Sequence, residues 1–398
     1  MTLTVTRGQV RAAAAGVAVT FGLNGVAVAT WFARVPVARE ALGLTAGALG
    51  LLLLSMSAGA FLAMLTAGEV THRLGPRRTV VLSAAVVSTG LAVAGAGIGA
   101  VPSVALTAIG IFVLGYGSGT CDVAMNVEAA EVERALGKTV MPRFHAMWSL
   151  GTVAAAGLAS LVAWLLLPVT AHLLVVAAVV AAGTLLAART YRFAGEPEHG
   201  TGSGVLAAWR EPRTLLVGAL VLVLAFTEGT ANDWVAVAFV DGYDFDTGTG
   251  ALVFGVFVTT MTAGRIAGTV ALDRWGRVPV LVVTMLLAAA GVTLAVFAGS
   301  PGLAIAGVAV WGLGTALGFP VGMSAAADDP AHAAARVSVV AVIGYTAFLA
   351  GPPLVGFLGD HVGVLRGLLV VPLLLLPALA FVPALRPLPQ SVPEEVSR

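Results

Sequence analysis

Charged side chains are scarce in this sequence. Asp, Glu, Lys and Arg together make up 10% of its 398 residues, whereas 59% are hydrophobic and the mean hydropathy is +0.99. An average soluble domain carries roughly 25% charged residues, so a soluble protein of this composition could not cover its surface with polar groups. The sequence therefore predicts a protein that is embedded in a lipid bilayer. The net charge of +1 provides no field that would attract nucleic acid.

Cysteine and the common catalytic motifs are also lacking. Cys121 is the only cysteine, which excludes an intrachain disulfide. The sequence has no HExxH, paired CxxC, GxSxG or Walker A motif, and no close cluster of metal-ligating residue types. We therefore expect no metal site, no cofactor and no catalytic residues, and we do not expect an enzyme.

Long apolar runs, in contrast, are abundant. A helix needs roughly 20 apolar residues to cross the hydrocarbon core of a bilayer, and charges and turn residues divide this chain into twelve segments of about that length. The predicted fold is an all-α membrane protein with twelve transmembrane helices. These helices are expected at 11–33, 47–70, 79–99, 102–127, 143–167, 171–190, 214–240, 249–270, 279–298, 302–326, 335–358 and 364–385.

Basic residues lie mainly on one side of the predicted helices. Of the 21 Lys and Arg, 17 fall in the terminal segments or in loops on the same side, and only Arg34, Arg39 and Arg366 fall on the opposite side. Loops rich in Lys and Arg stay in the cytoplasm. Both termini are therefore predicted to be cytoplasmic.

The two halves of the chain repeat the same features. A polar stretch of flexible-linker composition at 195–204 separates six predicted helices from six others. The sequence thus predicts an N-terminal bundle over 1–190, a cytoplasmic linker over 191–213 and a C-terminal bundle over 214–398. Gly115-Tyr-Gly117 in the fourth span matches Gly312-Leu-Gly314 in the tenth. Parallel repeats of six helices are the architecture of major facilitator transporters.

A loop motif carries the family resemblance. Gly68, Arg73, Gly75 and Arg77 match the pattern Gly-x-x-x-Asp-Arg-x-Gly-Arg of the major facilitator superfamily, with His72 where the family usually has Asp. A second copy follows the eighth span and consists of Asp273, Arg274, Gly276 and Arg277. The resemblance implies that these loops form a cytoplasmic gate, in which ion pairs brace a closed state; His72 departs from that charge pattern.

Finer features resemble the fucose-permease-like branch and its YbjJ-type bacterial inner-membrane members. The matching stretches are 31–36, 122–126, 145–151, 228–234 and 344–352. This resemblance implies a monomeric, multi-pass protein of the bacterial cytoplasmic (inner) membrane, whose partners are a small-molecule substrate and protons.

Ionisable residues within the first-half spans are candidates for proton coupling, because charge inside a bilayer is costly. Asp122 lies one helical turn before Asn126 on the same helix face. Asp122 could carry the proton, or it could be a structural residue that pairs with Arg143. His145 could relay protons, and Ser149 follows it by one turn, with Trp148 between them.

In the second half, Glu228 and Arg265 are the corresponding candidates. Glu228 lies past the middle of the seventh span, where it could couple protons or could simply pair with Arg265. Arg265 could bind substrate. Asn232 is a predicted substrate residue one turn further along, and Asp233 with Arg34 is a candidate outer gate.

The remaining predicted substrate residues are Asn24, Trp311 and Tyr345, together with Asn126, Trp148 and Ser149 named above. Aromatic faces suit ring-shaped ligands. Trp31 and Trp234 are instead expected in an outer aromatic belt, since tryptophan commonly anchors helices at the membrane interface.

The predicted function is secondary transport of a small polar, sugar-like solute by proton symport and alternating access. Two alternatives remain open. One is efflux of drugs or metabolites by proton antiport, which the absence of a Gly-Pro motif in the fifth span disfavours. The other is a receptor or sensor that does not transport.

Overall fold

The computed structural model describes residues 6–137, 140–193, 205–329 and 332–386, and these form helices without any strand. The elements are α1 (Arg7–Leu42), α2 (Ala46–Leu74), α3 (Pro76–Gly95), η1 (Ala96–Ala100), α4 (Val104–Leu136), α5 (Met141–Trp164), α6 (Val169–Ala188), α7 (Val205–Ala208), α8 (Pro212–Tyr243), α9 (Thr247–Trp275), α10 (Arg277–Phe297), α11 (Pro301–Thr315), α12 (Gly318–Ala326), α13 (Ala333–Val362), α14 (Val364–Gly367), α15 (Val370–Ala378) and η2 (Leu379–Leu385).

The twelve predicted spans are confirmed. Twelve helical stretches of the described chain are long and apolar enough to cross a membrane. The third span combines α3 with η1, the tenth combines α11 with α12, and the twelfth runs from α14 to η2. Several helices extend past the predicted ends; α1, for example, runs to Leu42 instead of 33. Gly43 then ends it in the left-handed conformation (φ 60°), which glycine adopts without steric cost.

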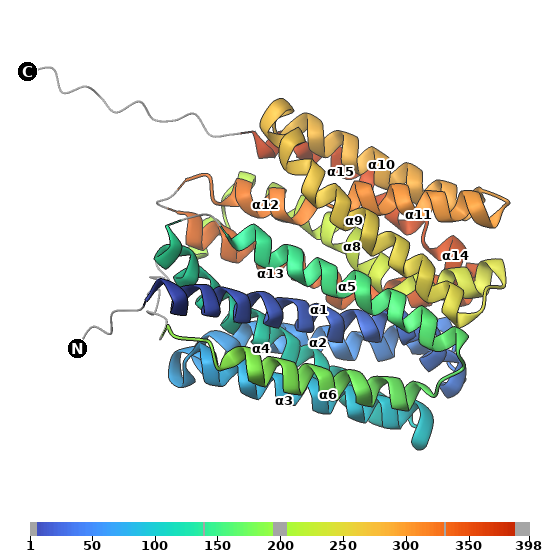
Figure 1. Cartoon of the computed structure of the whole chain (residues 1–398). Helices are drawn as coiled ribbons and strands as arrows, with labels where there is room; N and C mark the ends of the chain where they lie inside the picture. The colour runs from blue at the N-terminus through green and yellow to red at the C-terminus, as the bar shows by residue number, and fades with distance from the viewer. Residues whose placement is uncertain (1–5, 138–139, 194–204, 330–331, 387–398) are drawn as a thin grey trace, which may run out of the picture.

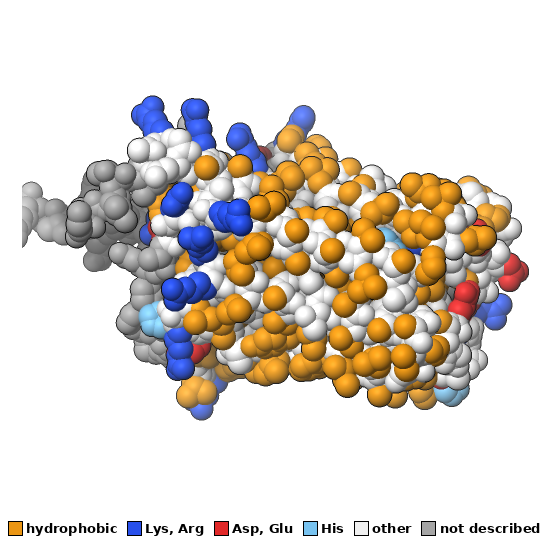
Figure 2. All heavy atoms as spheres, turned by 60° about the horizontal axis from the view of Figure 1, so that its bottom comes forward, with side chains coloured by type: hydrophobic (Ala, Val, Ile, Leu, Met, Phe, Trp, Pro, Cys, Tyr) orange, Lys and Arg blue, Asp and Glu red, His pale blue; other side chains and the backbone are white. Residues whose placement is uncertain are grey.

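The described chain begins with α1 and ends with η2 on the same side of the helical bundle (Figure 1). We call this side the terminal end and the opposite side the distal end. Figure 2 shows that Lys and Arg side chains gather at the terminal end, while hydrophobic side chains cover the middle of the visible face. A lipid-facing band with basic residues at one border fits a multi-pass membrane protein.

The helices form two groups that follow chain order. Helices α1 to α6 pack mainly against one another, as do the helices from α8 onward. The groups meet where α2 packs against α13 and where α5 packs against α9. Part of the predicted linker, residues 194–204, lies outside the described residues.

Equivalent glycines bring equivalent helices close together in the two groups. A Cβ atom at Gly115 of α4 would overlap the carbonyl oxygen of Met56 in α2, and one at Gly312 of α11 would lie 2.6 Å from the carbonyl oxygen of Phe257 in α9. Small residues of this kind allow helix backbones to approach in membranes. The glycine pair that suggested a repeat therefore performs the same packing task in both halves.

Candidate functional site

A cavity of about 210 Å³ lies between the two helix groups. Its walls come from α1 and α2 of the first group and from α8 and α13 of the second. Most lining side chains are apolar or aromatic, and few are polar. The lining residues are Phe32, Leu53, Met56, Ser57, Ala60, Phe61, Gly229, Asn232, Asp233, Tyr345 and Phe348. An apolar cavity with a few convergent polar groups is the usual form of a small-molecule site.

Asp122 and its neighbours, predicted site residues of the first group, are not among the described residues that line the cavity. Asp122 is exposed, and Asn126 Nδ2 donates to its carbonyl oxygen (2.8 Å) and its Oδ1 (3.3 Å). His145 of α5 is also exposed, and its ring lies edge-on to Phe21 at 5.1 Å between centroids. Asp122 and Asn126 thus form a pair on α4, and His145 packs against α1 from α5.

Glu228 and Arg265 form an ion pair in the second group. Arg265 Nη2 lies 2.9 Å from Glu228 Oε1, and its Nε donates to the carbonyl oxygen of Ala316 at 3.3 Å. Neither residue is among the described residues that line the cavity. Of the two interpretations of Glu228, the pair with Arg265 is therefore formed in this structure.

Other predicted substrate residues take different places. Asn232 and Tyr345 line the cavity, Trp148 is half-buried, and Ser149 is buried. Asn24 is buried too, and its amide donates across to the carbonyl oxygen of Ser118 in α4 (3.5 Å).

Trp311 has no exposed surface and packs edge-on against Phe257, with 5.5 Å between ring centroids. The structure does not bring Asn24 or Trp311 to the cavity wall. Both instead join neighbouring helices of one group.

Two expectations about the distal part of the molecule are wrong. Arg34 does not pair with Asp233: its Nε donates to His172 Nδ1 at 3.1 Å inside the first group, whereas Asp233 faces the cavity. Trp31 and Trp234 are fully buried, so they do not form an exposed interfacial belt. Both errors arise because these helices are apolar on all sides, so the sequence does not reveal which face turns inward.

The contacts that close the distal end were not apparent from the sequence. Arg39 at the end of α1 forms an ion pair with Asp241 at the end of α8. Thr45 donates to Asp360 across α2 and α13 at 3.3 Å. A Cβ at Gly50 would overlap the carbonyl oxygen of Pro352. These partners are about 200 residues or more apart in the chain, and only the fold identifies them.

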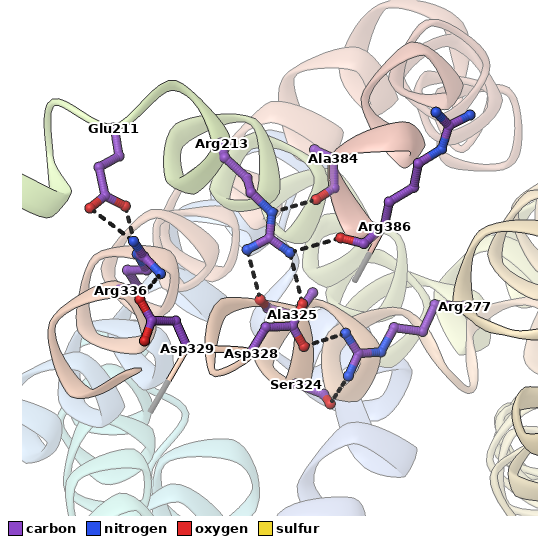
Figure 3. A network of polar contacts seen from close by, with 10 residues as sticks. All are labelled: Glu211, Arg213, Arg277, Ser324, Ala325, Asp328, Asp329, Arg336, Ala384 and Arg386. Atoms are coloured by element: carbon purple, nitrogen blue, oxygen red, sulfur yellow. Dashed lines mark hydrogen bonds and ion pairs between the residues drawn. The ribbon is translucent and has the colours of Figure 1, made fainter. Parts of the chain in front are cut away.

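At the terminal end, ion pairs brace the second group internally (Figure 3). Asp328 accepts from Arg277 (2.6 Å) and from Arg213 (2.8 Å), and Arg336 donates to Glu211 at 2.6 Å. Hydrogen bonds from Arg336 hold the pKa of Glu211 below its usual value.

The loop motifs do not join the two groups in the part of the chain that the structure describes. Arg73 pairs with Glu69 of its own helix (2.6 Å), and the Arg274 guanidinium lies 5.4 Å from the ring centre of Trp275. His72 and Asp273 are exposed, and Gly68, Gly75, Arg77 and Gly276 complete the two motifs. The described hydrogen bonds and ion pairs between the groups lie at the distal end.

Comparison with known proteins agrees with this architecture. The model of the Major Facilitator Superfamily matches residues 221–398. An uncharacterized MFS-type transporter of Yersinia pestis is 33% identical over 346 residues, which cover 85% of this chain and 87% of that protein. The uncharacterized transporter y4wD of Sinorhizobium fredii is 32% identical over 348 residues, covering 87% and 90%.

Solved structures share the fold at low sequence identity. The nucleoside transporter NupG superposes with a TM-score of 0.77 at 15% identity, over 93% of this chain and 99% of its own. The Escherichia coli fucose:proton symporter FucP superposes with a TM-score of 0.64 at 16% identity, over 93% and 97%. The twelve-helix fold and the sequence relatives agree, and the chain belongs to the major facilitator superfamily as a membrane transporter of the secondary-transport kind, not an enzyme.

Proposed function

We propose that this chain moves a small polar, sugar-like solute across the bacterial cytoplasmic membrane by proton-coupled symport. One observation carries the proposal. Ionisable residues lie within spans of both helix groups, Asp122 and His145 in one group and Glu228 and Arg265 in the other, and both groups line the cavity between them. A site shared between two repeats is where major facilitator transporters bind substrate.

We place the terminal end in the cytoplasm, because the basic side chains gather there (Figure 2). The distal contacts then close the periplasmic side, and the cavity belongs to an inward-facing state. Residues 1–190 and 214–398 rock about this cavity as two bundles, connected by the linker 191–213. The loop motifs around His72 and Asp273, which are separate in this state, approach each other when the cytoplasmic side closes.

Asp122 is the proton carrier in this proposal. Its side chain is exposed and has a neutral amide as its described partner, so it can exchange a proton with water. Glu228 is already neutralised by Arg265, at 2.9 Å. A proton on Asp122 removes the cost of carrying a bare carboxylate through the closed state. His145, exposed on α5, relays the proton.

The sugar-like solute class draws on the fold neighbours. They include a fucose:proton symporter, a D-xylose-proton symporter and a nucleoside transporter. Of the predicted substrate residues, Asn232 and Tyr345 line the cavity and offer polar groups to such a solute.

Transport by reconstituted vesicles tests this function. We expect an imposed proton gradient to drive accumulation of at least one labelled compound from a panel of sugars and nucleosides. Asp122→Asn should abolish gradient-driven accumulation while leaving exchange of pre-equilibrated solute intact, because only the coupling step needs the proton.

The matched control is Asp244→Asn, an exposed position whose left-handed backbone (φ 55°) asparagine tolerates. Solute extrusion against the proton gradient would overturn symport in favour of antiport. Unchanged accumulation in Asp122→Asn would remove Asp122 from the coupling step.

A further inference from the structure

Asp233 is the one carboxylate among the described residues that line the central cavity. It lies on α8 beside Asn232 and one turn after Gly229, and all three line the cavity. Its side chain is buried, with 9% of the residue exposed. The sequence suggested a gate role for Asp233, and the structure gives it a different position.

No described cation neutralises this carboxylate. Arg34 donates to His172 at 3.1 Å, Arg265 pairs with Glu228 at 2.9 Å, and Arg39 pairs with Asp241. The Asp233 side chain has no hydrogen bond or ion pair to another side chain in the described ranges. An ionised carboxylate with little access to water and no partner is costly, and either a bound proton or an ammonium group placed in the cavity would relieve that cost.

Aromatic rings complete the surroundings of Asp233. Phe32, Phe61, Tyr345 and Phe348 line the same cavity, and the Tyr345 and Phe348 rings are 5.9 Å apart between centroids. The face of an aromatic ring attracts cations. A buried carboxylate surrounded by aromatic rings is an arrangement that suits an ammonium group, whereas beside a neutral solute the carboxylate would have to bind a proton instead.

The cavity volume limits the size of the ligand. At about 210 Å³ it is smaller than the roughly 300–1,000 Å³ of pockets for drug-sized ligands. The occupant is therefore a small metabolite, with one charged end at Asp233 and an apolar or ring-shaped body against the aromatic walls.

We infer that the transported solute carries a protonated amine, and that Asp233 binds this amine inside the aromatic-lined cavity. The inference rests on the proposed function only in taking this cavity as the solute site. It narrows the solute class to small ammonium compounds, including those with a sugar-like ring, and gives Asp233 the role of deciding between charged and neutral solutes.

Paired probes of equal shape and different charge test this inference. The thermal stability of the purified full-length protein in detergent is measured with cyclohexylamine and with cyclohexanol, and with 2-phenylethylamine and 2-phenylethanol. We expect the amines, but not the alcohols, to raise the unfolding temperature. Asp233→Asn should weaken amine binding by about thirtyfold or more, Asp233→Glu should retain the preference for amines, and Asp244→Asn should behave as the unmodified protein.

Three results would overturn the inference: equal stabilisation by alcohol and amine, amine binding that survives Asp233→Asn, or no stabilisation by either amine. Each is distinguishable from failure of the proposed function, because binding in detergent needs no proton gradient. Gradient-driven uptake of a neutral sugar together with absent amine binding would reject the amine and leave symport standing.

Discussion

The three carboxylates of the predicted site differ in their partners, and the roles proposed for them rest on that difference. Asp122 is held by the neutral amide of Asn126 (3.3 Å), Glu228 by the cation Arg265 (2.9 Å), and Asp233 by no described side chain. In the proposed function Asp122, beside a neutral amide, carries the proton, and in the further inference an ammonium group supplies the partner that Asp233 lacks.

Glu211 allows a residue-scale prediction outside the membrane spans. Its hydrogen bonds to Arg336 lower its pKa, so its stabilising effect is fully present above the usual pKa of about 4.3 and is lost as the pH falls through the lowered value. The side chain of Glu211 is 33% exposed and that of Arg336 is 15% exposed. We expect Glu211→Gln to reduce the free energy of unfolding by about 0.5–1 kcal/mol at neutral pH.

Thermal unfolding of the unmodified protein and of Glu211→Gln, in detergent at neutral and at strongly acidic pH, measures this effect. The difference in stability between the two proteins should disappear in acid. Glu40→Gln, at an exposed position on α1, is the control and should show no difference at either pH. If Glu211→Gln lowered the stability by the same amount in acid and at neutral pH, the loss would not come from the ion pair of Glu211 with Arg336.

At the scale of elements, the sequence predicted the existence of the helices better than their ends or faces. All twelve spans were found because charges and turn residues interrupt the apolar runs. A predicted helix end fell short of the observed end where the helix leaves the hydrocarbon but continues beyond it, as α1 does through Arg39 and Glu40. Faces could not be assigned: Trp311 and Tyr345 look alike in sequence, yet only Tyr345 lines the cavity.

Close approach of α2 and α13 gives an element-scale prediction. Gly50→Ala would push the new Cβ into the backbone of Pro352, and a backbone carbonyl cannot move without its helix. Alanine also favours the helix more than glycine does, so α2 itself is not weakened. We expect the substitution to destabilise the distal-closed state by about 1–3 kcal/mol.

Labelling of a cysteine in the cavity wall measures this change. Ser57→Cys is introduced in a Cys121→Ala background, and intact cells are treated with a membrane-impermeant maleimide. Gly50→Ala should increase the labelling rate about fivefold or more. Gly157→Ala is the matched control, because a Cβ there meets no atom within 4 Å. Equal labelling rates in the Ser57→Cys parent, Gly50→Ala and Gly157→Ala would show that α2 and α13 do not close the distal end.

At the scale of the whole molecule, the two ends of the bundle are held together differently. The distal contacts join the two helix groups, through Arg39 with Asp241 and Thr45 with Asp360. The terminal network around Asp328 stays within the second group (Figure 3). One end is thus bridged between the groups and the other is braced within one group, an arrangement that suits the proposed alternating access.

The most direct test of this account is the relative movement of the two groups. Spin-label pairs are placed at the distal end (Glu40 with Asp244) and at the terminal end (His72 with Arg274), all exposed positions. Distances are measured in membranes at neutral and acidic pH, with Cys121 replaced by alanine. Rocking about the cavity predicts that acid lengthens the distal distance and shortens the terminal one. Two distances that stay fixed, or that change in the same direction, would contradict it.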